Sequence, residues 1–267
     1  MHVASLHTYP IKGSHRNDHD EARVERRGLT GDRRWILVDP DGVGLTQRQL
    51  PLLSQLRITP VADGLVVRTE GRLDLRVAEP VDGPKAFVRV FKSKPPVTAR
   101  VAADDGWFTE FLGRPARLVW QADPESRTIE QFAGVDDRVS FADGYPMLIT
   151  NEGSLSALND WLAEAGEEPV PMTRFRPNVV LAGAAPWAED DWQGRVLRIG
   201  EISARAAKPC DRCLVTTIDQ ETGVKTGQPL KMLGRHRNLP GGLLFGMNLI
   251  PDTPGVIRVG DEVTLAS

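Results

Sequence analysis

The sequence predicts a mainly β protein with a few helices, folded as closed barrels more readily than as a parallel sheet. Most segments are short, rich in β-branched residues and separated by turn signals. Strand-like segments outnumber helix-like segments well beyond one to one, whereas a parallel sheet needs a helix for almost every strand. The 267 residues, 40% of them hydrophobic and 26% charged, have the composition of a soluble globular protein with a substantial core.

The first part of the chain is expected to form antiparallel strands. Residues 33–48 have the pattern of a strand, an Asp-Pro-Asp-Gly turn and a second strand, and residues 64–80 repeat this plan with Glu70 and Gly71 at the bend. Two more strands are expected at 87–90 and 97–101. The spacing of Trp107, Phe108, Phe111 and Leu112 then predicts a helix that stops at Gly113 and Pro115. We therefore expect one domain over residues 1–115 and a second over 116–267.

The second part combines strands with two helices. Leu155, Leu158, Trp161 and Leu162 share one helical face, and Gly166 ends that helix. A second helix is expected over residues 230–236. Strands are predicted within 145–150, 175–183, 194–209, 213–219 and 254–265.

The charge balance and the N-terminus exclude several classes of protein. A net charge of −3 gives no overall attraction to nucleic acid or to an anionic membrane, so an anion site would have to be local. Residues 1–13 do not form a charged leader followed by an apolar stretch, and no run of about 18 apolar residues follows. Two cysteines three positions apart cannot staple a secreted domain. We expect a cytoplasmic protein that binds neither membrane nor nucleic acid.

Both cysteines lie in the segment "KPCDRCLVTTID", residues 208–219, and three uses of the thiols are open. A redox dithiol normally has a helix after its first cysteine, but the β-branched run after Cys213 favours a strand. Zinc needs at least three ligands, and His15 and His19 lie far upstream in a polar stretch that suits a solvated loop. The third use is one thiolate acting as a nucleophile or as a ligand to a soft metal.

Charged neighbours favour the third use of the thiols. Arg212 adjoins Cys213, and Lys208 precedes the pair, so fixed positive charge lies near both sulfur atoms. Burial of both cysteines as small apolar residues is the alternative. Pro209, Asp211 and Arg212 argue against it, because a buried strand seldom contains a proline and two charges.

Basic residues elsewhere indicate an anion site. Arg174 and Arg176 alternate along "TRFRPNVVL", and would project from the same face if that segment is extended. Asn178 follows them. Lys12 is expected at the end of one strand, and Arg33 with Arg34 at the start of another. Guanidinium groups suit phosphate or carboxylate, and an asparagine amide suits a heterocycle. Each residue alone would be an ordinary surface charge, so the anion site depends on their convergence.

Seven segments in the same order resemble one known family along nearly the whole chain. They are "YPIKG", "GDRRWILVD", "LTQRQLP", "FADGYPMLITNEGSLSALN", "TRFRPNVVLAG", "KPCDRCLVTTIDQETG" and "PGVIRVGDEV". The sequence is similar to proteins that join a molybdenum cofactor sulfurase C-terminal (MOSC) domain to an N-terminal β-barrel domain, among them the mitochondrial amidoxime-reducing component and its bacterial relatives. The resemblance implies a β-barrel-like domain over 1–115 and a β-barrel MOSC domain over 116–267.

The resemblance also implies a cofactor and the residues that hold it. The cofactor is a molybdopterin-type molybdenum cofactor, with Cys213 as the protein ligand to molybdenum and Cys210 as a bystander. Pyridoxal phosphate binding also goes with the family as a whole. Asp211 and Asp143 are the candidates by position for delivering a proton. Gly13 and Gly144 stand where the family pattern has hydroxyl residues. The residues assigned to the pterin and its phosphate are Lys12, Arg33, Asp143, Gly144, Arg176, Asn178, Asp211 and Arg212.

The implied activity is the reduction of N-hydroxylated compounds such as hydroxylamines, amidoximes and N-hydroxylated bases. The two cysteines leave no ligands for an iron–sulfur cluster, so electrons would come from a separate ferredoxin, flavoprotein or cytochrome b5-like protein. The alternative is a carrier without catalysis, which would bind the cofactor or hold sulfur on Cys213. A dithiol redox protein is the third interpretation.

Overall fold

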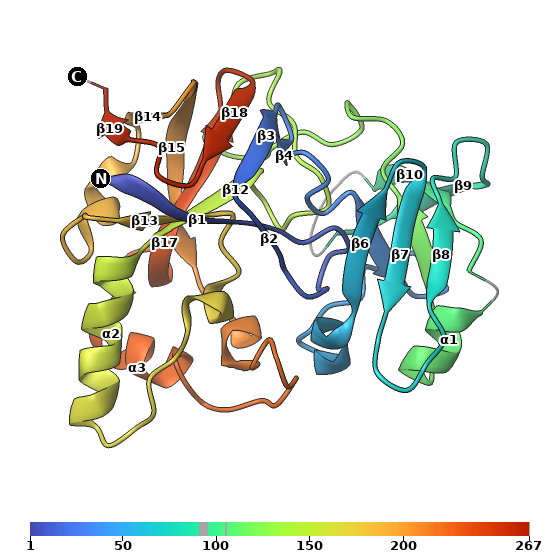
Figure 1. Cartoon of the computed structure of the whole chain (residues 1–267), viewed down its shortest axis with the longest axis horizontal. Coiled ribbons are helices and arrows are strands. Elements are labelled where there is room, and N and C mark those ends of the chain that lie inside the picture. Colours follow the sequence, from blue (N-terminus) through green and yellow to red (C-terminus); the bar gives the residue numbers. More distant parts are fainter. Residues whose placement is uncertain (91–95, 105, 267) are drawn as a thin grey trace.

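The computed structural model describes residues 1–90, 96–104 and 106–266, and it confirms a mainly β fold with few helices. The largest sheet has nine strands in the order β19-β14-β15-β17-β12-β13-β1-β2, with β16 paired to β17 (Figure 1). Only β12 and β13 pair in parallel among these strands of the described chain. The strands are β1 (His2–Thr8), β2 (Asn17–His19), β12 (Met147–Asn151), β13 (Val179–Ala182), β14 (Val196–Ile199), β15 (Ile202–Asp211), β16 (Asn238–Leu239), β17 (Gly242–Pro251) and β19 (Val263–Leu265).

Backbone hydrogen bonds close this sheet into a barrel. The Val3 amide donates to the Asp261 carbonyl at 2.9 Å, and the Val263 amide donates to the Met1 carbonyl at 2.9 Å. These bonds bring the start of β1 against β19, at the other end of the strand order, so β2 and β16 lie outside the ring. A closed barrel has no exposed sheet edge along the strands that close it.

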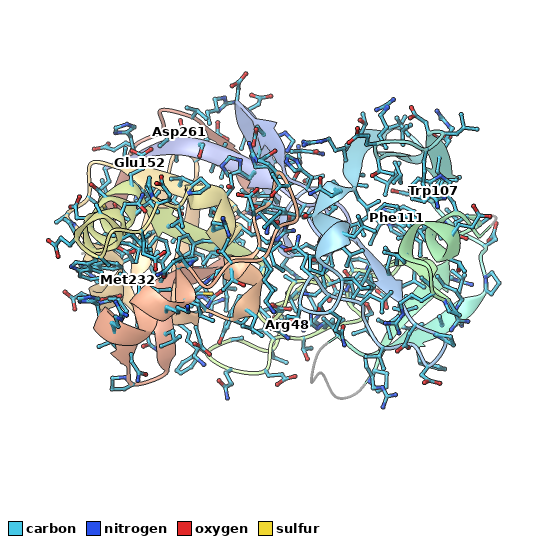
Figure 2. The ribbon with its side chains drawn as sticks, turned by 90° about the horizontal axis from the view of Figure 1, so that it is seen from below. Arg48, Trp107, Phe111, Glu152, Met232 and Asp261 are labelled. Carbon is cyan, nitrogen blue, oxygen red and sulfur yellow. The ribbon has the colours of Figure 1, made fainter. Side chains whose placement is uncertain are left out.

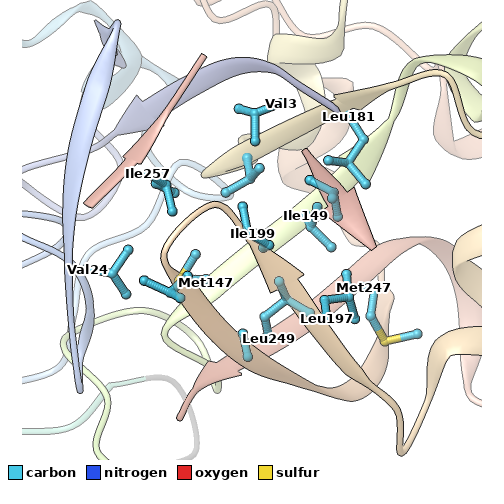
Figure 3. Packing of buried hydrophobic residues seen from close by; sticks show 14 of the residues in the cluster. Val3, Val24, Met147, Ile149, Leu181, Leu197, Ile199, Met247, Leu249 and Ile257 are labelled. Carbon is cyan, nitrogen blue, oxygen red and sulfur yellow. The ribbon is translucent and has the colours of Figure 1, made fainter. Parts of the chain in front are cut away.

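The interior of the barrel is filled by aliphatic side chains from both ends of the sequence. Val3 of β1, Ile149 of β12 and Leu197 of β14 are fully buried in one cluster, seen in close-up in Figure 3. A three-stranded sheet, β18 (Gly255–Arg258), β3 (Glu21–Glu25) and β4 (Gly28–Leu29), packs against it through Val24 and Ile257. Burial of this many aliphatic groups is the main stabilising contribution to such a core.

Two smaller sheets build the other half of the molecule. One has the order β5-β11-β10-β9 and the other β6-β7-β8. Helix α1 (Trp107–Leu112) covers their shared core with Trp107 and Phe111 (Figure 2), and it ends at Gly113 with a left-handed φ of 63°. The strands are β5 (Trp35–Val38), β6 (Arg57–Val61), β7 (Gly64–Arg68), β8 (Leu75–Ala78), β9 (Lys85–Val88), β10 (Val97–Val101) and β11 (Arg117–Trp120).

Helices α2 (Glu152–Glu164) and α3 (Leu230–His236) lie together against the barrel, below it in Figure 1. The Asn151 side chain accepts a hydrogen bond from the Gly153 amide at the start of α2. Both helices therefore match the sequence-based expectation. Four short 3₁₀ helices complete the fold: η1 (Pro51–Gln55), η2 (Met172–Phe175), η3 (Ala188–Trp192) and η4 (Leu214–Thr217).

Three local expectations from the sequence were wrong. The segment after Cys213 is the 3₁₀ helix η4 and not a strand. Arg174 belongs to η2, and Arg176 has a left-handed φ of 55°, so the two arginines do not share one face of an extended segment. After the turn at 39–42, Val43 and Gly44 form isolated bridges and no regular strand.

Strand pairing crosses the predicted domain boundary. β11 begins at Arg117 and pairs with both β5 and β10, while β1 and β2 belong to the large sheet. The expected boundary between two domains at residue 115 stays a prediction. Among the described residues, no helix is long and apolar enough to cross a membrane.

Candidate functional site

Lys12 and Asp143, which lie far apart in the sequence, form an ion pair in the candidate site. The Lys12 amide donates to the Trp35 carbonyl, which fixes the backbone beside β5. Its Nζ lies 2.5 Å from Asp143 Oδ1 and donates to the Phe141 carbonyl at 2.8 Å. The Lys12 charge holds the pKa of Asp143 well below its usual range, while burial lowers the pKa of Lys12. Asp143 is therefore a carboxylate, and its exposed side chain faces solvent.

Arg33 and Arg176 lie against the ring of a fully buried tyrosine. Their guanidinium carbons lie 4.5 Å and 4.1 Å from the Tyr9 ring centroid. Arg33 Nη1 also lies 2.5 Å from the buried carboxylate of Asp32. Both arginines have a left-handed backbone conformation, with φ of 49° and 55°, which residues other than glycine seldom adopt. Two strained residues pointing cations at one ring indicate a functional site.

Arg176 keeps one hydrogen-bond donor unused. Its Nη1 donates to the Ser14 carbonyl at 2.9 Å and to Gln220 Oε1 at 2.7 Å. Its Nη2 is buried and has no hydrogen-bond partner among the described residues. Burial lowers the pKa of Arg176 to about 10, so the side chain remains charged at neutral pH. A buried charged donor without a partner is costly, and an anionic ligand would satisfy it.

The side chain of Asn178 is occupied within the protein. Its Oδ1 accepts from Arg33 Nη1 and from the Leu148 amide, both at 3.1 Å, and its Nδ2 donates to the His7 carbonyl at 3.1 Å. Asn178 thus orients Arg33 and joins β1 to β12. Its predicted contact with the pterin remains a prediction.

The two cysteines contact different arginines. Arg48 Nη2 lies 3.3 Å from Cys213 Sγ, and Arg212 Nη1 lies 2.8 Å from Cys210 Sγ. Cys213 is the N-cap residue of η4, a 3₁₀ helix of four residues, whereas Cys210 lies within β15. Arg212 also donates to the Phe175 carbonyl at 2.6 Å.

Asp211 is the last residue of β15. Its Oδ1 accepts from the Leu243 amide at 2.9 Å, so the carboxylate ties β15 to the start of β17. The role in proton delivery that the sequence predicted for Asp211 stays a prediction.

Arg127 holds the loop that carries Asp143. Its guanidinium donates to the carbonyls of Ser140, Ala142 and Asp143, at 2.7, 2.5 and 2.7 Å. Burial lowers the pKa of Arg127 to about 10. Each of these bonds fixes one peptide of the loop, so Arg127 sets the position of the Asp143 carboxylate.

Only part of the predicted convergence of basic residues is present: Lys12, Arg33 and Arg176 come together, whereas Arg34 pairs with Glu25 and Arg174 pairs with Asp219. Five cations lie near enough to Asp143 to interact electrostatically with its carboxylate. The contacts described above include only two carboxylates, those of Asp143 and Asp32. Figure 2 shows Arg48 at the junction of the two halves of the molecule. We call these five residues the cationic cluster: Lys12, Arg33, Arg48, Arg127 and Arg176.

Arg48 and Arg127 were missed by the sequence analysis. Arg48 lies in the segment "LTQRQLP", which carries part of the family resemblance, and that is the only signal that could have drawn attention to it. Arg127 lies in no such segment, and a lone arginine in a loop gives no signal. Only the folded chain brings either residue to Asp143.

The two glycines at family hydroxyl positions differ in their surroundings. A Cβ on Gly144 would meet no atom within 4 Å. Gly13 has φ of +90°, and a Cβ there would lie 3.3 Å from Leu53 Cδ1. Gly144 therefore leaves open space in the site, whereas the backbone at Gly13 requires glycine.

His15 is not in a solvated loop, contrary to the sequence-based expectation. It is buried, and its Nε2 lies 3.0 Å from Glu221 Oε2. Arg16 and Arg57 pair with the same carboxylate. These residues line a groove of about 460 Å³ between β2 and β6. No group of three or more potential metal ligands among His, Cys, Asp and Glu occurs in the described part of the chain.

A closed β-barrel that brings one of its two arginine-bound thiols, Cys213, to a cationic cluster is suited to bind an anionic ligand. Residues 1–115 match the family described as "MOSC N-terminal beta barrel domain", and residues 136–264 match "MOSC domain". The chain belongs to the family of MOSC-domain proteins with an N-terminal MOSC β-barrel domain.

The curated relatives span nearly the whole chain. It is 32% identical to the mitochondrial amidoxime-reducing component 1 of Mus musculus and to that of Homo sapiens, over 98% of this chain and 82% of each relative. It is 30% identical to the molybdenum cofactor sulfurase of Oryza sativa subsp. japonica, over 100% of this chain and 34% of that protein. Among solved structures, the YUAD protein of Bacillus subtilis matches with a TM-score of 0.43 and 10% identity, over 98% of this chain and 93% of that one.

Proposed function

We propose that this protein is a molybdenum-cofactor-dependent oxidoreductase that reduces N-hydroxylated compounds. The observation that carries the proposal is the meeting of one thiol with the cationic cluster, through Arg48 at 3.3 Å from Cys213 Sγ. The names of the relatives that are 32% identical, amidoxime-reducing components, support the substrate class.

The residues fit the cofactor that this family implies. Arg176 offers a buried, unpartnered donor, which suits a phosphate, and Lys12 and Arg33 add positive charge beside it. Cys213 offers a sulfur ligand of the kind that soft metal ions prefer. When bound, the cofactor would supply the two-electron chemistry that removes oxygen from the substrate nitrogen as water.

The acids near this site differ in the proton chemistry available to them. Because Lys12 holds the pKa of Asp143 well below its usual range, Asp143 is ionised at neutral pH and is too weak a base to take up a proton there. Lys12 Nζ, which bonds Asp143 Oδ1, is a cation that can donate one. The carboxylate of Asp211 bonds the Leu243 amide. We therefore favour Lys12, whose pKa burial lowers, over Asp211 for delivering a proton.

The electron donor belongs to the proposal as well. Reduction of an N-hydroxylated substrate consumes two electrons, and two cysteines cannot hold an iron–sulfur cluster in addition to the metal ligand. A separate ferredoxin, flavoprotein or cytochrome b5-like protein would supply the electrons, in the cytoplasm.

A carrier of cofactor or sulfur is the second candidate. It is favoured by the match to the rice molybdenum cofactor sulfurase, which covers all of this chain. A carrier would bind the cofactor, or hold sulfur on Cys213, without turning over an N-hydroxylated substrate.

Metal analysis combined with an activity assay tests both candidates. Protein isolated from a molybdenum-replete host should contain about one molybdenum per chain and should reduce benzamidoxime with a chemical electron donor. Stoichiometric molybdenum without turnover of benzamidoxime or hydroxylamine would favour the carrier. Protein without molybdenum, both as isolated and after incubation with the cofactor, would refute the proposed reductase.

A further inference from the structure

Arg48 is the contact through which the N-terminal half reaches the thiol of the other half. It follows β5 in sequence and lies within a turn over residues 46–50, whereas Cys213 follows β15 of the barrel. Its Nη2 lies 3.3 Å from Cys213 Sγ, within hydrogen-bonding range for sulfur. The resemblance assigns no role to Arg48, and the cationic cluster would attract an anion without any contact to sulfur.

The backbone around Arg48 is held firmly in place. The amides of Gln49 and Leu50 both donate to the Thr46 carbonyl, which makes a tight turn at Arg48. The neighbouring side chain, Gln47, is buried and donates to the Gly13 carbonyl at 2.7 Å. The amides of Gln47 and Gln220 also bond each other in both directions, at 2.9 and 3.0 Å.

The anchored turn therefore aims Arg48 at a fixed point. Gln220 follows η4, and η4 begins directly after Cys213. The bridge that holds Gln47 therefore also holds the segment that carries Cys213. A charged donor that is fixed in advance loses little conformational freedom when it binds its partner.

We propose that Arg48 is a positioning residue for Cys213, which fixes the direction of its sulfur and raises the reduction potential of the metal ion that this sulfur would bind. The inference rests on the proposed function. A hydrogen bond from a cation withdraws electron density from a ligating thiolate, and hydrogen bonds to sulfur are among the features that set metal potentials in proteins. Reduction adds negative charge to the centre, so a nearby guanidinium stabilises the reduced state more than the oxidised state.

Three variants of the holoprotein test the inference. Arg48→Gln removes the charge and the forked donor, and Arg48→Lys keeps the charge but loses the planar fork. Arg57→Gln is the matched control, because Arg57 also joins the two halves, through Glu221, but contacts neither cysteine in any described hydrogen bond. Each protein is analysed for molybdenum and titrated with a reductant while the Mo(V) electron paramagnetic resonance signal is followed.

We expect Arg48→Gln to shift the midpoint potential to more negative values and to change the g-values of the Mo(V) signal. Arg48→Lys should change the g-values with a smaller shift in potential, and Arg57→Gln should match the wild type. A loaded Arg48→Gln protein with wild-type potential and signal would overturn the inference, as would an equal shift in Arg57→Gln.

Two further outcomes keep the inference separate from the proposed function. If Arg48→Gln does not fold, Arg48→Lys decides, and an unchanged Mo(V) signal in that variant overturns the inference. A wild-type protein that carries no molybdenum would remove the proposed function and the inference together, whereas a loaded wild type with insensitive Arg48 variants would remove the inference alone.

Discussion

The arginine partners of the two cysteine sulfur atoms contact different groups. Arg48 connects Cys213 to Asp143, because both groups lie close enough to the Arg48 guanidinium to interact electrostatically with it. Arg212 connects Cys210 to the Phe175 carbonyl and the Phe175 ring. The electrostatic connection to the cationic cluster supports Cys213 as the metal ligand.

Replacing each thiol by a hydroxyl tests this assignment. Cys213→Ser should lose metal-linked activity, because a serine hydroxyl is a poor substitute for a soft thiolate ligand. Cys210→Ser should keep much of it. Benzamidoxime reduction and molybdenum content of the purified variants provide the measurement, and the reverse pattern would show that Cys210 is the ligand.

The two glycines offer a second matched pair. Gly144→Ser should leave the free energy of unfolding nearly unchanged, because a Cβ there meets no atom within 4 Å. Gly13→Ser should cost about 1–2 kcal/mol, the usual penalty for a side chain in a left-handed conformation. Urea unfolding measures both. Equal losses in the two variants would contradict the difference that the structure shows.

At the level of single residues, the sequence predicted chemical types better than contacts. Lys12, Arg33 and Arg176 were identified as an anion site because their side chains suit phosphate, and they do converge. The internal bonds of Asn178 and the approach of Arg48 to Cys213 could not be predicted. Both depend on segments that are far apart in the sequence, and no local pattern encodes such contacts.

Among the secondary-structure elements, the helices were the most predictable. α1 and α3 occupy the expected residues, and α2 ends close to Gly166, because spacing and stop signals lie within the segment itself. η4 was mistaken for a strand because its residues are β-branched. Hydrogen bonds from the Thr216 and Thr217 side chains to the carbonyls of Cys213 and Leu214 favour the tight turn over that propensity.

The start of α2 gives a prediction about stability. Asn151 is fully buried, accepts from the Gly153 amide at 2.9 Å and donates to the Ala185 carbonyl at 2.7 Å. Asn151→Ala should lower the free energy of unfolding by about 2 kcal/mol, since it removes a helix cap and leaves a buried carbonyl without this donor. Asn159→Ala, in the middle of α2 and only part-buried, is the comparison. A loss below that of Asn159→Ala in chemical denaturation would refute the role of the cap.

In the molecule as a whole, polar bridges at two adjacent residues just after η4, Gln220 and Glu221, join the halves. Gln47 pairs with Gln220, and one residue further on Glu221 pairs with Arg16 and Arg57. Although partial burial acts in the opposite direction, hydrogen bonds from Arg16 and His15 lower the pKa of Glu221 to about 2. The loop from Asp219 to Glu221 is thus attached to both halves at once.

This bridge should make stability depend on pH in the acid range. The pKa of Glu221 is lower in the folded state than its ordinary value of 4.5, so its contribution is complete above pH 4.5 and is lost as the pH falls towards about 2. Glu221→Gln should be less stable than the wild type at pH 7, and the difference should shrink at pH 3. Urea unfolding at both pH values measures it, with Glu164→Gln on α2 as a control. A difference that stays constant with pH would argue against the bridge.

The closure of the barrel has a consequence for the order in which the chain can fold. β1 leaves the ribosome long before the Asp261 carbonyl that accepts from Val3 is synthesised. The smaller sheets, whose strands are closer in sequence, and the pairing of β1 with β2 can form while translation continues, whereas closure of the barrel must wait for the segment that carries Asp261. Such long-range pairing slows folding and leaves apolar strand surface uncovered in the meantime. The cationic cluster likewise cannot be complete before Arg176 is synthesised, and its contact with Cys213 needs a segment that is made later still.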